Sequence, residues 1–526
     1  MIRSLICTFP FLLLALITSA CTSTSIPSLL NTPTPLPAPS QPPPLLTPFD
    51  PAQGKPDTLM TPDPYPPDAP TSLPEVPTPL PATPTPLPNT THYTLHATLD
   101  YAVKHVTIAQ TIHYYNNTGQ SLDELLLVIE PNWTEGVFHL DQITWEDGNA
   151  IENWNLNANI LRFPLRETLT PEGELTLGLS YRLILPAQAG MLGFDLRGVN
   201  LGNWYPFIPP YQSGTGWLAY QRGWVGEHFS HALAGYTVEL TLTNPPAGVV
   251  VAASAPVEQD VASGLDADTY RFHLPLARSF ALAISPEFHV FRTTVGDVEV
   301  ISYAYPETLA AGERALQVTA DALALYSELF GPYPHPTMSV VQVSFPDGME
   351  FDGLYFLSEL YYWGYPVNSD RLVAAQNHLT FIAAHETSHQ WWYALIGNDQ
   401  AIEPWLDETL ATYTELLFYE HYYPELVEWW WAFRVDYYDP RDCCVNDTIY
   451  QYGDVRPYIN AVYLRGAHFM QDLRDSLGDE AFSAALKTFA ERYRGGFVTS
   501  QDFWAVIGEY TVEDLTPLRQ RYFGGG

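Results

Sequence analysis

The chain has 526 residues, of which 59 are Asp or Glu and 23 are Lys or Arg, so its formal net charge is −36. This length is enough for two or three domains with a large core. The charge argues against a nucleic-acid-binding protein, because phosphate contacts need a basic surface. It fits a soluble, self-repelling protein outside the cytoplasm.

The N-terminus has the features of an export signal. Met1-Ile2-Arg3 is followed by an apolar run, residues 5–17, that is too short to span a bilayer comfortably. Small residues then precede Cys21, as in a bacterial lipoprotein cleavage site. We therefore expect residues 1–20 to be a signal peptide and Cys21 to carry a lipid at the cell surface. Thr18 stands where leucine is usual and also suits an ordinary signal peptidase, so secretion without a lipid stays open.

Residues 21–91 are rich in Pro and Thr. Pro-Thr-Pro-Leu-Pro recurs there, starting at Pro33, Pro77 and Pro84. Such a segment cannot bury enough apolar surface to fold and favours extended polyproline geometry. We expect a disordered linker between the anchor and the folded part of the chain. A ligand for proline-binding modules is the other interpretation.

Period-two alternation begins near Tyr93 and continues to about Pro286. Between residues 106 and 114, Val and Ile alternate with polar residues and stop at Asn116-Asn117-Thr118-Gly119, a strand followed by a turn. No long helical period intervenes. The pattern predicts a β-sandwich-like domain over residues 92–289. Its other predicted strands are residues 125–129, 175–185, 236–242, 249–252, 270–273 and 280–284.

The pattern becomes mainly helical over residues 290–526. A helical run without proline, residues 307–330, ends at Gly331-Pro332. Residues 340–343 are a predicted strand that leads into a loop. The chain is therefore predicted to be an α+β multidomain protein. Further helical patterns cover residues 379–392, 408–422, 471–477, 480–493 and 500–510.

His385-Glu386-Thr387-Ser388-His389 lies inside the predicted helix 379–392. Residues four apart on a helix are offset by only about 40°, so His385 and His389 present two imidazoles side by side. Glu386 points roughly 100° away and can reach a metal-bound water without being a ligand. With a third ligand and an open fourth position, this arrangement predicts one catalytic Zn²⁺. The alternative is a core helix with satisfied histidines, but polar groups in an apolar aromatic run cost free energy unless they are bonded.

Eighteen residues separate His389 from Glu408, the last residue of Trp405-Leu406-Asp407-Glu408. With this segment, the stretch resembles the aminopeptidase N family of zinc metallopeptidases, the gluzincins. The resemblance implies that Glu408 is the third zinc ligand. It also implies that residues 290–526 form a thermolysin-like, mainly helical zinc peptidase domain behind the β domain. The resemblance covers roughly Tyr93 to the C-terminus. It implies a short form of the family, without the long helical C-terminal domain of the larger members.

Two further motifs carry the resemblance. Asp347-Gly348-Met349-Glu350 resembles the G-x-M-E motif, which implies that Gly348, Met349 and Glu350 bind substrate and that Glu350 holds the free amine. Tyr463-Leu464-Arg465-Gly466 resembles the Y-x-K-G motif, which implies that Tyr463 stabilises the oxyanion. Tyr458 is the competing candidate for that role.

The sequence also departs from the family pattern. Asp347 replaces the first glycine of its motif, and Phe351 replaces the usual asparagine. The β domain has no clear counterpart of the segment that supplies a second amine-binding side chain. Glu227 is a candidate for that role, but no motif fixes it there.

We therefore expect a surface-tethered zinc metallopeptidase that removes N-terminal residues from peptides outside the cytoplasm. Glu386 would act as general base toward a zinc-activated water. The expected partners are peptides with a free N-terminal amine, and the only expected link to a membrane is the lipid anchor. Two other interpretations stay open: a zinc endopeptidase or other hydrolase on the same scaffold, and a non-catalytic surface lipoprotein with a retained metal site.

Overall fold

The computed structural model of the chain describes residues 89–258, 268–441 and 444–524. All of them belong to the second of two compact units, Thr78–Gly526. The predicted signal peptide, the lipidation site Cys21 and the predicted linker up to residue 88 lie outside the described residues. Among the residues that are described, no helix is both long and apolar enough for a membrane span.

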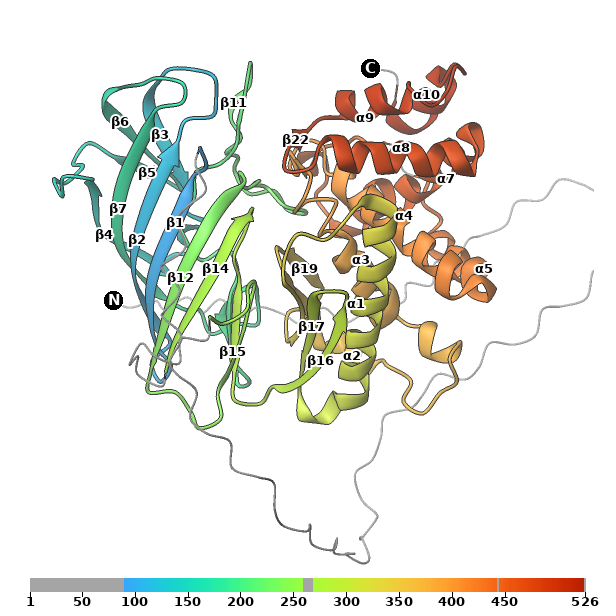
Figure 1. Ribbon diagram of the computed structural model, residues 1–526, viewed down its shortest axis with the longest axis horizontal. Coiled ribbons are helices and arrows are strands. Elements are labelled where there is room, and N and C mark those ends of the chain that lie inside the picture. The colour runs from blue at the N-terminus through green and yellow to red at the C-terminus, as the bar shows by residue number, and fades with distance from the viewer. Residues whose placement is uncertain (1–88, 259–267, 442–443, 525–526) are drawn as a thin grey trace, which may run out of the picture. The chain divides into compact units, whose positions relative to one another are not determined.

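The N-terminal half is built from β-sheets (Figure 1). Its largest sheet has the strand order β14-β12-β1-β2-β7-β4, and β3-β6-β5 form a smaller one. The alternation in β2 explains the packing, because its Val and Ile side chains are buried while the intervening residues are exposed. The strands are β1 His92–Asp100, β2 His105–Tyr115, β3 Leu122–Val128, β4 Phe138–Trp145, β5 Asn155–Asn157, β6 Ile160–Leu169, β7 Glu174–Ile184, β8 Leu192–Phe194, β9 Val199–Leu201, β10 Tyr211–Gln212, β11 Gly216–Trp217, β12 Ala234–Thr243, β13 Val250–Ala253, β14 Thr269–Ala277 and β15 Leu282–Ser285.

Every strand that the sequence predicts in this half overlaps an observed strand, but several observed strands were not predicted, among them the long strands β4 and β6 and the short strands β5 and β8–β11. The pairing of β4 with β7 shifts between Leu140 and Gln142, a bulge that interrupts the period of two. β6 contains Pro164, a residue that argues against a strand when only the sequence is read. Local irregularity, rather than a different architecture, hid these two strands.

A four-stranded sheet, β13-β15-β9-β8, joins the two halves of the molecule. On β15 and its approach, Leu282 and Ile284 point into the core of the N-terminal half. Ala281 and Ala283 point the other way, into a separate cluster with Met349 and other residues of the second half. Period-two alternation therefore gives this sheet two buried faces, one for each half.

The second half contains a five-stranded sheet, β16-β17-β18-β20-β19, with α1 packed against β16 and β17 (Figure 1). The fold class predicted from the sequence is confirmed. The strands are β16 His289–Val295, β17 Val298–Ala304, β18 Thr337–Val343, β19 Gly348–Phe351, β20 Leu354–Ser358, β21 Gly397–Asn398 and β22 Phe497–Val498. The helices are α1 Leu309–Phe330, α2 Glu359–Trp363, α3 His378–Ser388, α4 Trp405–Tyr422, α5 Val427–Trp430, α6 Val455–Tyr458, α7 Gly466–Leu477, α8 Asp479–Arg492, α9 Ser500–Ile507 and α10 Thr516–Phe523.

The helix that carries the two histidines is shorter than its hydrophobic pattern suggested. The Asn377 side chain caps its N-terminus by accepting a hydrogen bond from Thr380 N. It ends at Ser388, although helical pattern continues to Trp392. The indole of Trp391 donates to Gly331 O and that of Trp392 to Thr414 Oγ1, so tertiary contacts bury these side chains outside the helix. α4 begins at Trp405, three residues before the predicted start at residue 408.

One buried cation links the two halves. Arg278, only 2 % exposed, lies at the end of the last long strand of the N-terminal half. Its guanidinium donates to four backbone carbonyls, and Asp352 Oδ2 accepts from its backbone N–H at 3.0 Å. The four carbonyls belong to His231, Tyr393, Ala394 and Gly496.

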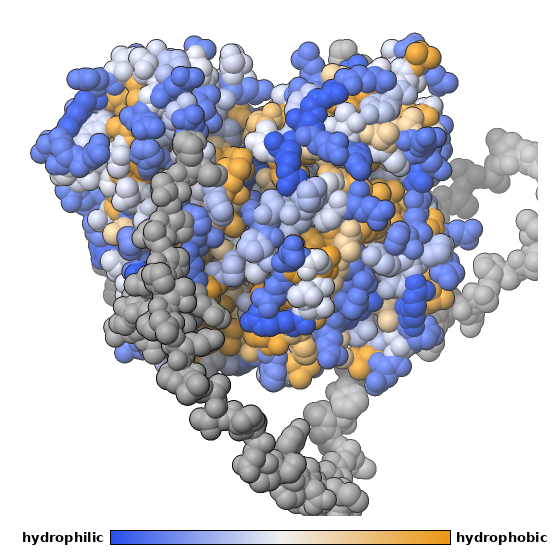
Figure 2. Space-filling model, viewed as in Figure 1, coloured by the Kyte–Doolittle hydropathy of each residue, from blue (hydrophilic) through white to orange (hydrophobic). Residues whose placement is uncertain are grey.

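The face of the molecule seen in Figure 2 is mostly hydrophilic, with hydrophobic residues in small separate patches. This surface agrees with the large net negative charge of the chain.

Candidate functional site

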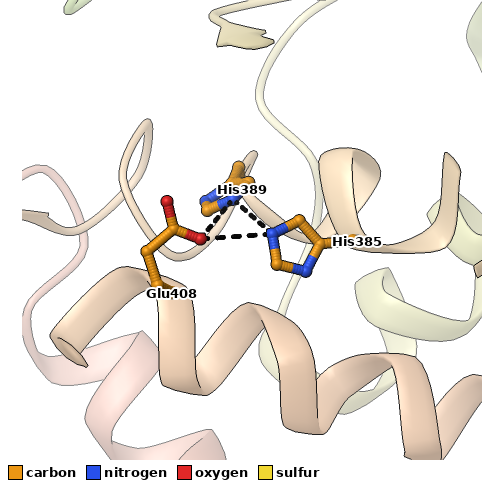
Figure 3. Close-up of side chains that lie close together, drawn as sticks. All are labelled: His385, His389 and Glu408. Carbon is orange, nitrogen blue, oxygen red and sulfur yellow. Dashed lines mark hydrogen bonds and ion pairs between the residues drawn. The ribbon is translucent and has the colours of Figure 1, made fainter. Parts of the chain in front are cut away.

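The three predicted zinc ligands come together where α3 packs against α4: His385 lies on α3, His389 directly follows the last residue of α3, and Glu408 lies on α4 (Figure 3). His385 Nε2 lies 3.1 Å from His389 Nε2. Glu408 Oε2 lies 3.2 Å from His385 Nε2 and 3.6 Å from His389 Nε2. The three donor atoms therefore form a small triangle in a buried site.

The opposite nitrogen of each imidazole is already occupied. His385 Nδ1 donates to Glu415 Oε1 at 2.9 Å, and His389 Nδ1 donates to Trp392 O at 2.9 Å. Glu415 in turn accepts from Arg434 at 2.9 Å. These contacts fix the tautomers so that both Nε2 atoms are free to bind a metal.

Glu415 and Arg434 were not predicted from the sequence. The signal for Glu415 was present, because it follows Glu408 by seven residues, which is two helical turns, and so lies on the same face of α4. No comparable signal exists for Arg434, which comes from a separate segment after α5.

The donor set fits a zinc ion. With metal–ligand bonds of about 2.0–2.1 Å, neighbouring donors of a tetrahedral site are about 3.3 Å apart, close to the three separations found here. Burial opposes a charge on His385, but the Glu408 and Glu415 carboxylates raise its pKa to about 9. Burial also disfavours the Glu408 carboxylate, yet hydrogen bonds from the two histidines hold its pKa below the usual value. The surroundings favour positive charge at this point, as a dication site requires.

Glu386 lies beside this cluster and outside its ligand triangle. Its Oε2 atom is buried and has no hydrogen-bond partner among the described residues. Its Oε1 atom packs so closely on Gly348 that a Cβ at that position would overlap it. Burial raises the pKa of Glu386 to about 8. One carboxylate oxygen therefore remains available for a proton from a reactant.

The predicted substrate-binding segment is the edge strand β19. Alternation along this strand places Gly348 and Glu350 on one side, and Met349 and Phe351 pack in the cluster shared with the four-stranded sheet. Glu350 is only 4 % exposed. Its carboxylate, that of Glu386 and a nitrogen of His389 lie within 4.8 Å of one another, so a substrate ammonium held by Glu350 would sit next to the metal ligands.

Tyr463 and Tyr458 line the same cavity as the three predicted metal ligands. Tyr463 belongs to a π-helical turn, Ile459–Arg465, and its ring stacks on that of His385 with centroids 5.9 Å apart and planes at 11°. The Tyr458 ring is 5.6 Å from that of Tyr463, and its hydroxyl packs against Gly226. Burial and the Glu408 charge raise the pKa of both phenols well above 10, so both hydroxyls keep their protons and can donate.

A cavity of about 640 Å³ is lined by all the residues predicted for the metal, catalysis and substrate binding. Glu227 lines it as well, and burial together with the charges of Glu350 and Glu408 raises its pKa well above the usual value. Met191 and Phe345 line both this cavity and a neighbouring one of about 270 Å³. The three predicted metal ligands, the carboxylate of Glu386 and the two phenols therefore line one cavity.

Comparison with known proteins places this site in a family context. Residues 314–522 match the model of the peptidase family M1 domain. Aminopeptidase M1-A from Oryza sativa subsp. japonica is 26% identical over 291 residues, which are 52% of this chain and 32% of that protein. Endoplasmic reticulum aminopeptidase 2 from Homo sapiens is 24% identical over 387 residues, 67% of this chain and 38% of that protein. The chain spans about a third of the length of the relatives it matches.

Among solved structures, the fold resembles the crystal structure of a mutant M1 zinc metallopeptidase from Deinococcus radiodurans. The TM-score is 0.56 at 19% sequence identity, and the match covers 82% of this chain and 94% of that one. The likeness therefore extends over both halves of the molecule and not only over the metal-binding helices.

Proposed function

The chain belongs to peptidase family M1, of the aminopeptidase N type, and on that basis we propose that it is a zinc aminopeptidase that removes N-terminal residues from peptides outside the cytoplasm. The observation that carries the proposal is the single cavity described above. It combines a two-histidine, one-carboxylate ligand set with an unpartnered carboxylate, Glu386, and a buried anionic group, Glu350.

His385, His389 and Glu408 would hold one zinc ion. When bound, zinc supplies Lewis acidity, which lowers the pKa of a water molecule and polarises a carbonyl group. The Glu415 and Trp392 acceptors keep the two imidazoles oriented for this role.

Glu386 takes a proton from the attacking water and passes it to the leaving amine. Its position against Gly348 limits the directions in which its carboxylate can turn. The Tyr463 hydroxyl donates a hydrogen bond to the oxygen of the scissile carbonyl as negative charge develops there. This contact is strongest in the transition state, so it raises kcat rather than ground-state affinity.

Glu350 pairs with the α-ammonium of the substrate and restricts cleavage to the first peptide bond. Glu227 supplies a second carboxylate to the same cavity and serves as a further amine anchor. Two carboxylates near one ammonium would offset each other's repulsion through the shared cation. The carboxylates that line the cavity would favour substrates with a free amine. The lining residues do not determine which side chain the first residue of the substrate carries.

The exported location is part of the proposal. The N-terminal sequence supports a signal peptide over residues 1–20 with lipidation at Cys21, and the Pro-rich linker would then separate the enzyme from the membrane. Mass spectrometry of the mature N-terminus tests this directly. A lipid on Cys21 supports anchoring, and an unmodified N-terminus after residue 20 supports secretion.

Hydrolysis of aminoacyl amides and their N-acetylated counterparts, with and without a chelator, tests the proposed activity. We expect cleavage of the free-amine set alone, loss with chelator and recovery with Zn²⁺. Cleavage of both sets would indicate an endopeptidase on the same scaffold. Stoichiometric zinc without any hydrolysis would indicate a binding protein.

Replacing Glu350 with alanine should chiefly damage the recognition of free amines. We expect KM for aminoacyl amides to rise about 10²-fold, because a buried ion pair with the substrate is lost. The zinc content should stay the same, since Glu350 is not in the ligand triangle. Steady-state kinetics checks this, and equal loss for blocked and free ligands would contradict the anchor role.

Replacing Tyr463 with phenylalanine should lower kcat about 10²-fold with little change in KM, because an oxyanion donor acts in the transition state. Tyr458→Phe is the matched control. Its hydroxyl faces Gly226 rather than the histidine ring, so a much smaller loss is expected. The reverse order of the two variants would assign the oxyanion role to Tyr458.

A further inference from the structure

Gln400 is a buried amide in the loop between α3 and α4, only 2 % exposed. Its Nε2 atom donates to Asp407 Oδ2 at 2.8 Å and to Glu350 Oε1 at 3.3 Å. One NH₂ group therefore uses both of its protons on two buried carboxylates. No part of the proposed function above uses this residue.

The contact matters most for Glu350. Among the side chains of the described residues, Gln400 is the one that donates a hydrogen bond to this carboxylate. The other charged groups near it include the imidazoles of His389 and His385, which attract it, and the carboxylates of Glu408 and Glu386, which repel it. A buried carboxylate with a single weak donor keeps its other lone pairs for the substrate, but it also depends on that donor for its position.

Asp407 extends the contact to the metal ligands. Its other oxygen, Oδ1, accepts from Glu408 N at 3.0 Å at the start of α4. The chain of contacts therefore runs from Glu350 through the Gln400 amide and Asp407 to the residue that supplies the third metal ligand.

The N-terminal half holds the loop that carries Gln400. Ser230 Oγ donates to Asn398 O at 2.9 Å and accepts from Gln400 N at 3.3 Å. Tyr220 donates its hydroxyl proton to Asp399 Oδ2 at 2.6 Å. Three consecutive residues of the loop, 398–400, thus bind to side chains from the β-rich half. Gln400 is therefore held by its backbone N–H as well as by its side-chain amide.

We propose that Gln400 is a positioning residue that sets the separation between the amine anchor Glu350 and the metal ligands, and thereby confines cleavage to the first residue. The proposal rests on the proposed aminopeptidase function, because it concerns the same ammonium. If the separation between Glu350 and the metal ligands changes, the substrate cannot place its ammonium on Glu350 and its scissile carbonyl at the metal at the same time. Discrimination between free and blocked substrates then declines.

The test is the affinity of zinc-loaded protein for leucine hydroxamate and for N-acetyl-leucine hydroxamate, measured by calorimetry. Both ligands reach the metal through the hydroxamate, so the ratio of their Kd values reports the ammonium contact alone. We expect the wild type to favour the free amine and Gln400→Leu to lose roughly 10- to 100-fold of that preference, with the affinity for the acetylated ligand unchanged. In turnover, KM for aminoacyl amides should rise more than kcat falls.

Gln342→Leu is the matched control. Gln342 lies in β18, is also fully buried and does not line the cavity. Its side-chain oxygen accepts hydrogen bonds from Tyr305 N and Thr308 Oγ1. It should lower thermal stability without changing the ratio of Kd values. If Gln400→Leu does not fold, Ser230→Ala loosens the same loop and should reduce the preference several-fold.

An unchanged ratio in a folded, zinc-loaded Gln400→Leu protein would overturn the proposal, as would equal weakening of both ligands. A wild type without preference for the free amine would overturn it as well. A wild type that prefers the free amine but hydrolyses nothing would refute the proposed activity, while a reduced preference in the variant would still support the positioning role.

Discussion

Glutamine in place of Glu386 is expected to lower kcat for aminoacyl amides by about 10⁴-fold, at the upper end of what one acid–base group contributes. The side chain keeps its size and can still pack against Gly348. What it loses is the ability to accept a proton from water and return it to the leaving amine. Among the described residues, no group forms a hydrogen bond with the Oε2 atom, so this oxygen is open to a reactant.

Zinc content should be unaffected in the Glu386→Gln protein, because its oxygens lie outside the triangle formed by His385, His389 and Glu408. Steady-state kinetics and metal analysis on the same sample check both halves of the expectation. Glu420→Gln is a suitable control, since this residue pairs with Arg474 near the opposite end of α4. A variant that loses zinc together with activity would show that Glu386 acts as a ligand rather than as a base.

Replacing Arg278 with methionine is expected to destabilise the protein by at least about 3 kcal/mol, the scale of an uncompensated buried polar group or charge partner. Methionine fills similar space but donates no hydrogen bond. Four carbonyl oxygens would be left without this donor, on segments from both halves of the molecule. The backbone of Gly397 lies directly against the guanidinium: a Cβ atom at this glycine would come within 2.5 Å of it. The neighbouring residues therefore have little room to rearrange.

Denaturant unfolding of wild type and Arg278→Met measures this loss. Arg474→Met is the matched control, because Arg474 is partly exposed and pairs with Glu420 and Asp479 near the surface. We expect that control to cost about 1 kcal/mol or less. Similar losses for the two variants would mean that the carbonyls around residue 278 find other donors or water.

The grouping of His385, His389 and Glu408 could be predicted from the sequence for two reasons. The spacing of His385 and His389 fixes their common face, and the resemblance to a known family supplied Glu408, Glu350 and Tyr463. The contacts that support these residues could not be predicted in the same way. The partners of Glu415 and Gln400 come from segments whose approach is decided by packing, and neither spacing nor composition encodes that approach.

The fold shows the same division between local and tertiary information. Regular alternation revealed β2 and β12, whereas the bulge in β4 and the proline in β6 concealed those strands. Trp391 and Trp392 extended the apparent helical pattern because large apolar residues favour burial in any conformation. Both tryptophans lie beyond the last residue of α3, and their indole N–H groups donate to a residue of α4 and to the turn after α1. Such tertiary contacts are not encoded in the local pattern.

The four-stranded sheet between the two halves has a consequence for how the chain could be divided. Its alanine face shares one apolar cluster with Met349 and Phe351, the residues that form the underside of β19. Glu350 projects from the upper side of that same strand. A fragment that starts at residue 290 would keep every metal ligand but expose the underside of β19 to water. The proposed amine recognition is therefore expected to depend on both halves, because the strand that carries Glu350 shares its apolar cluster with the N-terminal half.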